Sequence, residues 1–275
     1  MSVDLHIHTT ASDSLWTPKA LAAEVWREGL AAFAVTDHDT DAALDETARE
    51  AEALGLTFVR GVEFSCWYKG VEVHILGYFV DRGHHALEQL IRRIERLLVE
   101  GATECAKKMR AAGLSLPDFR FTGKRHAYVE LSQSLVDSGE AKTLEDAFRI
   151  VIDPKSNFFV RPFRPGPREV IEAIRGSGAV TSLAHPIRRG VSPIRIAEEI
   201  DAFQEMGLQA IEVFSPHHDA EHTSILLEWS RERGLGATGG SDNHKGLLSG
   251  RTSRLADIPD WVYEELVSLR DGSSA

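Results

Sequence analysis

The chain has 275 residues, of which 43% are hydrophobic and 27% are charged, as in ordinary globular proteins. Its net charge of −11 and isoelectric point near 5.6 argue against binding of long duplex nucleic acid, which needs a broad basic surface. No apolar run approaches the roughly 18 residues of a membrane-spanning helix, so we expect no membrane association. We expect one large domain, or one domain with an insertion.

The two cysteines, Cys66 and Cys105, form no Cys-x-x-Cys pair. We interpret them as ordinary reduced thiols. The N-terminus enters a strand pattern at once, without the basic and apolar regions of a secretory leader. These features predict a cytoplasmic protein.

Apolar or β-branched segments alternate with helical patterns along most of the chain. The predicted strands are Val3–His8, Ala31–Thr36, Thr57–Glu63, Val71–Val80, Ala179–Ala184, Ala210–Phe214 and Gly236–Gly240. The predicted helices are Pro18–Glu28, Asp41–Leu54, Pro167–Gly176, Pro193–Gly207, Ala220–Gly234 and Pro259–Arg270. Because repeated strand–helix alternation is typical of parallel sheets, we expect an α/β fold whose seven strands form a closed or nearly closed barrel.

One connection between predicted strands is too short for a parallel arrangement. Only Cys66–Gly70 separate the third and fourth strands, whereas a parallel crossover needs a dozen residues or more. We therefore predict a hairpin with an antiparallel fourth strand. This hairpin would bring Glu63 and His74 to the same end of the barrel.

Residues 84–165 do not continue the alternation. Apolar residues recur there at three- and four-residue steps from Leu87 to Met109, which predicts one long amphipathic helix. Shorter helices are predicted at Ala127–Asp137 and Thr143–Ile152. We therefore predict a barrel of residues 1–83 and 166–275, with residues 84–165 as an inserted helical subdomain. The insertion is either a peripheral stabilising cap or a lid that contacts substrate.

Histidine and carboxylate residues gather at the ends of the predicted strands. His6 and His8 are two residues apart in a strand, so both imidazoles lie on one face. Asp242 and His244 repeat this spacing. The other candidates are Asp13, His38, Glu63, His74 and His185. Because a barrel brings strand ends together, this pattern predicts a metal centre.

Each residue also has a simpler interpretation. Asp37 or Asp39 could cap the helix after the second strand, with Asp39 the better candidate, and Asp13 could cap a turn. His185, before Pro186, could be a buried histidine with ordinary hydrogen bonds. A single His-x-His pair is also common without a metal. The joint occurrence at so many strand ends favours the metal interpretation.

These motifs resemble those of the PHP (polymerase and histidinol phosphatase) family, in order and at similar intervals. They are Asp4-Leu5-His6-Ile7-His8, Thr36-Asp37-His38, Gly61-Val62-Glu63-Phe64-Ser65, His74-Ile75-Leu76-Gly77, Ala184-His185-Pro186 and Gly240-Ser241-Asp242-Asn243-His244. The resemblance extends from Val3 to about Leu255. It implies a distorted seven-stranded (β/α) barrel and three divalent metal ions, often manganese, iron or zinc.

The resemblance also implies how the ligands divide among the metals. His6, His8, Glu63 and Asp242 would hold the first metal, Asp13, His38 and His244 the second, and Glu63, His74 and His185 the third. Glu63 would thus bridge two metals. Many family members have His where Asp13 stands. Aspartate is a competent ligand for hard cations, so the difference could alter occupancy or metal preference at the second site.

The insertion, with Leu135-Val136-Asp137-Ser138-Gly139, resembles the branch containing nucleoside 3′,5′-bisphosphate phosphatases and a 5′-to-3′ exoribonuclease. This implies a phosphoesterase acting on a small phosphorylated substrate, either a nucleotide or a short RNA end. Histidinol phosphate is the alternative substrate. Arg188 matches a family arginine that grips phosphate. Lys124, Arg125 and His126 resemble a basic element of the lid, although their spacing to Leu135 is longer than usual.

The charge balance and the chemistry of metal-bound water favour a phosphate ester. Three divalent cations exceed the charge of Asp13, Glu63 and Asp242, and a hydroxide with a phosphate dianion would balance the excess. Metal coordination lowers the pKa of water, so a bridging hydroxide could attack phosphorus. His218, just past a predicted strand, could protonate the leaving oxygen, with His217 as the competing candidate.

Two other classes of protein remain as alternatives. An amidohydrolase-type deaminase or hydrolase also begins with His-x-His on a barrel strand, but it predicts eight strands and often a metal-bridging lysine. Lys69, in the predicted hairpin loop, is a poor candidate for that role. A non-catalytic metal-binding module, like the PHP domains attached to polymerases, is the other alternative.

Overall fold

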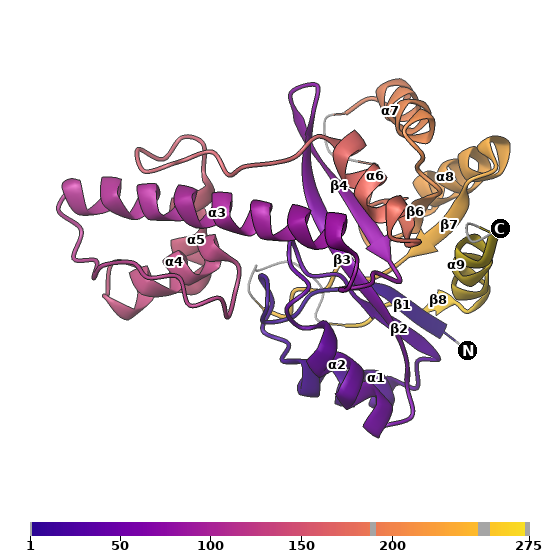
Figure 1. The fold of residues 1–275 in the computed structure, drawn as a ribbon, viewed down its shortest axis with the longest axis horizontal. Helices are drawn as coiled ribbons and strands as arrows, with labels where there is room; N and C mark the ends of the chain where they lie inside the picture. Colours follow the sequence, from indigo (N-terminus) through magenta and orange to yellow (C-terminus); the bar gives the residue numbers. More distant parts are fainter. Residues whose placement is uncertain (1, 188–190, 247–253, 273–275) are drawn as a thin grey trace.

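The computed structural model describes residues 2–187, 191–246 and 254–272 (Figure 1). An eight-stranded sheet lies at its centre, with the spatial order β7-β6-β5-β4-β3-β2-β1-β8. The strands are β1 (Ser2–Ile7), β2 (Ala32–Val35), β3 (Thr57–Tyr68), β4 (Val71–Tyr78), β5 (Val180–Leu183), β6 (Ala210–Phe214), β7 (Gly236–Gly239) and β8 (Ile258–Pro259). The first seven lie where the sequence predicts strands, which confirms the α/β barrel class.

The strand count differs from the prediction by one short strand. Only two residues form β8, which pairs antiparallel with the start of β1. The predicted last helix therefore begins at Trp261 rather than at Pro259. Proline is tolerated here because β8 lies at the edge of the sheet, where a backbone N–H is dispensable.

The sheet is nearly closed into a barrel by contacts between β1 and the segment after β7. Ile7 forms a parallel bridge with Asn243. The N–H of His8 donates to the Asn243 carbonyl at 3.1 Å, and the N–H of Asp242 donates to the His6 carbonyl at 2.9 Å. These bonds place the two His/Asp motifs from opposite ends of the chain side by side.

The predicted hairpin is confirmed. β3 pairs antiparallel with β4, with Ser65 opposite His74, and β4 in turn pairs antiparallel with β5. The predicted loop was too long, because β3 continues to Tyr68 and only Lys69 and Gly70 form the turn. Both have positive φ, 44° and 87°, as a tight two-residue hairpin turn requires.

Six helices in the described part of the chain accompany the barrel strands (Figure 1). They are α1 (Pro18–Glu28), α2 (Leu44–Ala53), α6 (Pro167–Gly176), α7 (Pro193–Glu205), α8 (Ala220–Arg233) and α9 (Trp261–Gly272). Sequence signals set the ends of α1: the Thr17 hydroxyl caps its first turn, and Gly29 ends it in the left-handed conformation. Ile7 of β1 is buried in the same core cluster as Leu21 and Val25 of α1.

The predicted capping role of Asp39 is wrong. Helix α2 begins at Leu44 after Ala43, which makes no side-chain cap, rather than at Asp41. Asp39 instead has a positive φ of 56°, and its carboxylate accepts a hydrogen bond from the N–H of Ser65 at 3.0 Å. The side chain thus joins the loop after β2 to strand β3, close to Glu63.

Three helices occupy the region predicted as an insertion. Helix α3 (His85–Ala111) is the predicted long amphipathic helix; α4 (Ala127–Asp137) packs against it, and α5 (Leu144–Ile152) packs against α4. Together they extend away from the barrel (Figure 1). The Arg93–Glu169 ion pair at 2.7 Å connects α3 with α6, and the N–H of Trp67 donates to the Pro165 carbonyl at 2.9 Å. None of the helices in the described part of the chain is long and apolar enough to cross a membrane.

Candidate metal centre

The barrel brings the predicted ligands together in three overlapping groups, each with ligand atoms within 4.8 Å of one another. They are His6, His8, Glu63 and Asp242; His8, Asp13, His38 and His244; and His38, Glu63 and His74. The ligands come from β1, the loops after β1, β2 and β7, and the β3–β4 hairpin. The grouping differs from the expected one because His8 belongs to two groups, and His38 stands in the third group where His185 was expected.

The first group is fully enclosed. His6, His8 and Glu63 have no solvent exposure, and Asp242 is 4% exposed. The Nε2 atoms of His6 and His8 both lie 3.2 Å from Oε2 of Glu63. Yet none of these three atoms makes a hydrogen bond with acceptable geometry among the described residues. Buried polar atoms that face one another without hydrogen bonds are costly, so the donor set fits a bound cation.

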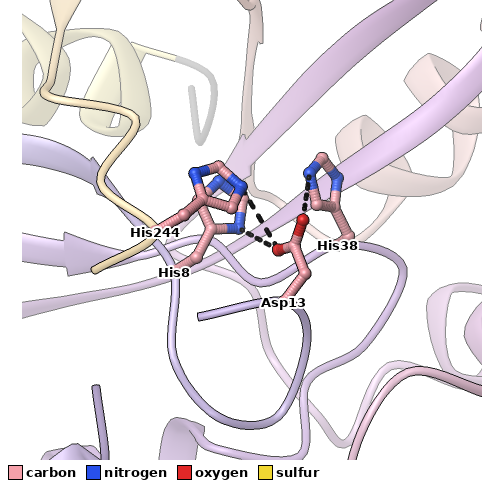
Figure 2. A group of neighbouring side chains, drawn as sticks. All are labelled: His8, Asp13, His38 and His244. Atoms are coloured by element: carbon pink, nitrogen blue, oxygen red, sulfur yellow. Dashed lines mark ion pairs between the residues drawn. The ribbon is translucent and has the colours of Figure 1, made fainter. Parts of the chain in front are cut away.

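The second group is centred on Asp13 (Figure 2). One carboxylate oxygen of Asp13 lies 3.2 Å from Nε2 of His244 and 3.8 Å from Nδ1 of His8, and the other lies 4.0 Å from Nε2 of His38. Figure 2 shows the imidazoles of His8, His38 and His244 turned toward this carboxylate. Aspartate therefore stands where its oxygens can share a cation with the three histidines.

Glu63 connects the first group with the third. Its Oε1 lies 2.8 Å from Nδ1 of His74 and 3.2 Å from Nε2 of His185. Its Oε2 faces His38 at 3.2 Å, as well as His6 and His8. Its two oxygens thus face opposite groups of imidazoles, as a bridging carboxylate would.

The side chains of the site shift one another's pKa values away from the usual values. Burial by itself would raise the pKa of Glu63, but the charges of His38, His6 and His74 hold it well below its usual value. Burial would lower the pKa of His74, yet Glu63 and Glu72 outweigh it and raise the pKa to about 10. Because ligating histidines must be neutral, a cation must displace protons here, and its affinity should rise with pH.

Carboxylates next to the cluster orient several ligands, and sequence analysis did not single out Glu212 for this role. Oε1 of Glu212 lies 2.9 Å from Nδ1 of His6, and Oε2 accepts from the N–H of His185 at 2.7 Å. The Ser12 hydroxyl lies 3.5 Å from Nδ1 of His8 and donates to Asp37 at 2.5 Å. Such partners set the tautomer of a ligating histidine, so its other nitrogen faces the metal. A lone glutamate within the apolar Ala210–Phe214 strand was the signal for Glu212.

Backbone geometry at the site is also unusual. His185 and Asp242 have positive φ values of 26° and 49°, which are uncommon for residues other than glycine. Such strain concentrates at functional sites. A Cβ atom at Gly240 would overlap the backbone and Cβ of His6. Only glycine allows the loop after β7 to approach β1 this closely.

The two candidate proton donors occupy different environments. Nε2 of His217 lies 2.8 Å from Oδ2 of Asp242, so this ring is part of the ligand cluster. Nδ1 of His218 instead lies 3.0 Å from the Val213 carbonyl. Burial lowers the pKa of His218, and its Nε2 has no hydrogen-bonding partner among the described residues.

The predicted substrate contacts that the structure describes have different environments. Arg188 lies outside the described residues. Arg125 donates from Nε to the Thr10 carbonyl at 3.3 Å and from Nη2 to the Ser14 carbonyl at 2.8 Å, so it holds the loop that carries Asp13. Lys124 is exposed. His126 lines a cavity next to the cluster, where burial and the charge of Arg164 lower its pKa to about 4.

Comparison with known proteins supports the interpretation of this site. Residues 4–114 match the PHP domain. A 5′-3′ exoribonuclease from Haemophilus influenzae is 28% identical over 268 residues, covering 94% of this chain and 97% of that protein. A 3′,5′-nucleoside bisphosphate phosphatase from Chromobacterium violaceum is 29% identical over 277 residues, covering 96% of each protein.

A solved structure has the same overall fold. It is described as a metal-dependent phosphoesterase from Bifidobacterium adolescentis, and it is 26% identical with a TM-score of 0.83. The match covers 97% of this chain and 96% of that one. Residues 4–114 thus match a PHP domain, and the chain as a whole is similar to an exoribonuclease, a nucleoside bisphosphate phosphatase and a metal-dependent phosphoesterase.

Proposed function

We propose that this enzyme hydrolyses a phosphate monoester, or a terminal phosphodiester, of a nucleotide or a short RNA end. The observation that carries the proposal is Glu63, whose two oxygens face five histidines of the ligand cluster. Relatives that are similar over nearly the whole chain, a nucleoside bisphosphate phosphatase and an exoribonuclease, support this substrate class.

Three divalent ions, manganese, iron or zinc, are the proposed cofactors. We propose that His6, His8, Glu63 and Asp242 hold the first, Asp13, His38 and His244 the second, and Glu63, His74 and His185 the third. When bound, such ions act as Lewis acids and lower the pKa of water to near neutrality. The protein supplies the ligand geometry, with Glu212 orienting His6 and the His185 backbone.

We propose His217, ahead of His218, as the proton donor to the leaving oxygen. His217 is partly exposed and touches Asp242, so it can reach a substrate bound at the cluster. The lowered pKa of His218 keeps its ring neutral near pH 7, and Nδ1 carries the proton in order to donate to the Val213 carbonyl. Its Nε2 then has no proton to give. Arg188 remains our proposed phosphate-gripping residue.

The assignment of the donor can be tested with a matched pair of variants. His217→Asn should lower kcat, whereas His218→Asn should change kcat only slightly. A leaving group of low pKa, such as p-nitrophenolate, needs no proton and should be much less affected by His217→Asn. If His218→Asn lowered kcat more than His217→Asn, His218 would be the proton donor instead.

The function itself is tested by metal analysis and a substrate panel. Manganese-loaded protein should release phosphate or nucleotide from nucleoside 3′,5′-bisphosphates or from 5′-phosphorylated RNA, and faster than phosphate from histidinol phosphate. Elemental analysis should find up to three ions per chain, with loss of activity on chelation and recovery on adding metal. Metal-bound protein that is inactive on all these phosphoesters would instead favour a non-catalytic module.

The amidohydrolase alternative is disfavoured by the strand arrangement. The eighth strand is not the eighth parallel strand of a regular (β/α)8 barrel, because β8 has two residues and pairs antiparallel with β1. Strand β4 is also antiparallel to both of its neighbours. Lys69 occupies the turn of the β3–β4 hairpin, away from the ligand cluster.

A further inference from the structure

A cavity of about 380 Å³ separates the ligand cluster from the helices of residues 84–165. We call it the barrel–insertion cavity. Asp13, His38 and His74 of the cluster line one side of it. The remaining lining residues are Ser65, Trp67, Glu72, His126, Tyr128, Val129, Phe148, Ile152, Pro154, Phe159, Arg161, Pro162 and Arg164. Its volume falls within the range of small-molecule sites.

The walls of this cavity beyond the cluster are largely apolar and aromatic. Trp67 comes from the end of β3 and remains 40% exposed, although it is one of the largest apolar side chains. The hydrogen bond from its N–H to the Pro165 carbonyl fixes its backbone. Tyr128, Phe148 and Phe159 face it from the insertion side. Exposed aromatic surface inside a concave site is typical of places where a flat apolar group binds.

Two arginines in the same wall differ in whether they form ion pairs with carboxylates. Arg164 is bound to Glu72 at 3.0 Å and lies 3.5 Å from Asp39, so its charge is already balanced. The guanidinium of Arg161 instead lies 4.7 Å from the centroid of the Trp67 ring. Arg161 is exposed, and it has no acidic partner in the described part of the chain. It can therefore bind an anion without losing an ion pair.

These observations deepen the proposed function, on which they rest. We propose that the barrel–insertion cavity recognises the nucleotide itself: the base packs against Trp67, and Arg161 binds a phosphate other than the one hydrolysed. Aromatic side chains and arginine planes are the usual partners of unstacked bases. Arginine is also the preferred side chain for bidentate phosphate contacts. The cluster would then bind the phosphate that is hydrolysed, and the cavity would bind the base and the second phosphate of the same substrate.

The stacking role is tested by comparing substrates with and without a base. We expect wild-type enzyme to prefer a nucleoside 3′,5′-bisphosphate over the abasic ribose 3,5-bisphosphate. Trp67→Ala should lower kcat/KM for the nucleoside substrate by roughly 5- to 150-fold, as loss of one stacked base predicts. It should change that for the abasic substrate by less than about twofold, because the abasic sugar has no base to stack. Trp67→Phe should restore most of the activity.

Trp26→Ala is the matched control, since Trp26 is also an exposed tryptophan, at 62%, but lies on α1 outside the cavity. It should leave both substrates unaffected. An equal loss of both substrates in Trp67→Ala, or no loss of either, would overturn the stacking role.

The anion role is tested by the number of phosphates on the substrate. Arg161→Gln should raise KM for the bisphosphate by about tenfold or more, the scale of a lost charge-assisted contact, and leave a nucleoside 3′-monophosphate unchanged. Arg96→Gln, at an exposed position of α3, is the control. An effect of equal size on both substrates would contradict a contact with the second phosphate.

Binding provides a readout that does not depend on turnover. In calorimetry with chelator-treated protein, adenosine 5′-monophosphate should bind more tightly than ribose 5-phosphate, and Trp67→Ala should abolish the difference. If the enzyme hydrolyses nucleotides without any base preference, this inference fails and the proposed function stands. If wild-type enzyme releases phosphate only from substrates other than nucleotides, the proposed substrate class fails as well.

Discussion

Two regions of the molecule are held together by different kinds of contact. One is the end of the barrel that carries the proposed metal ligands, here called the ligand end, and the other is the set of helices in residues 84–165, the insertion. At the ligand end, many buried side chains are polar and contact carboxylates such as Glu63, Glu212 or Asp37. The insertion instead buries an apolar stripe of α3 that includes Leu90, Ile94 and Leu98. Directional contacts tolerate little displacement, whereas apolar packing tolerates substitution that keeps volume. We therefore propose that the reaction chemistry belongs to the barrel and that the insertion shapes the substrate site.

The largest effect should come from the bridging position at the ligand end. Glu63→Gln keeps the size of the side chain but removes the charge that five imidazoles face. We expect turnover to fall by about 10³-fold, the scale for losing an electrostatic contact to the transition state, together with loss of bound metal. Elemental analysis and circular dichroism would separate metal loss from unfolding. Full activity in this variant would contradict the proposed metal centre.

The next effect should come from Glu212, which touches two proposed ligands without reaching the metals. We expect Glu212→Gln to weaken metal binding by roughly 10- to 100-fold, as loss of an outer carboxylate usually does. Competition with a chelator measures this directly. Glu228→Gln, at an exposed position of α8, is the control and should bind metal like wild type. Equal affinities for the Glu212 and Glu228 variants would show that Glu212 is structural only.

Arg125 tests whether the insertion and the ligand end are coupled. Its guanidinium holds the Thr10 and Ser14 carbonyls on either side of Asp13. Arg125→Met should therefore lower occupancy of the Asp13 group, with metal affinity there about tenfold weaker, given the strength of hydrogen bonds from charged donors. Lys124→Met is the neighbouring control. A higher KM with unchanged metal content would instead make Arg125 the substrate contact that the family resemblance implies.

The smallest effect concerns protonation within the cavity. His126 has a pKa lowered from 6.5 to about 4, first by burial and then by Arg164. Below pH 6.5, His126 is protonated in the unfolded chain but stays neutral in the folded chain. The free energy of unfolding should therefore fall as the pH drops toward 4. An NMR titration, with His126→Asn to assign the signal, should show a neutral ring at pH 6. A midpoint near 6.5 would mean that the ring is exposed to solvent.

Local patterns predicted much of this protein because they report local physics. The alternation of His6 and His8 with apolar neighbours placed both rings on one face, and the short connection after Cys66 required an antiparallel hairpin. The three- and four-residue steps from Leu87 to Met109 predicted α3, which runs from His85 to Ala111. The nine ligand candidates were found in this way, and the structure brings them together.

Other features were beyond local patterns. Capping propensity suggested that Asp39 begins α2, but a contact with Ser65 from another strand holds it in a positive-φ conformation. No local pattern indicated that the guanidinium of Arg125 contacts the loop that carries Asp13. Glu212 stood out only as a charge in an apolar strand, and nothing in the sequence said that it faces His6.

By itself, the sequence determined the barrel, the hairpin and the set of candidate metal-ligating side chains. Strand and helix periods and minimum loop lengths are properties of a few neighbouring residues, so the sequence alone reports them. Only the tertiary structure decided which ligands share a group, which histidine reaches the cluster, and that Trp67 and Arg161 line a cavity beside it. Those relations join residues far apart in the chain. They depend on how the strands close and how the insertion packs, which no local period specifies.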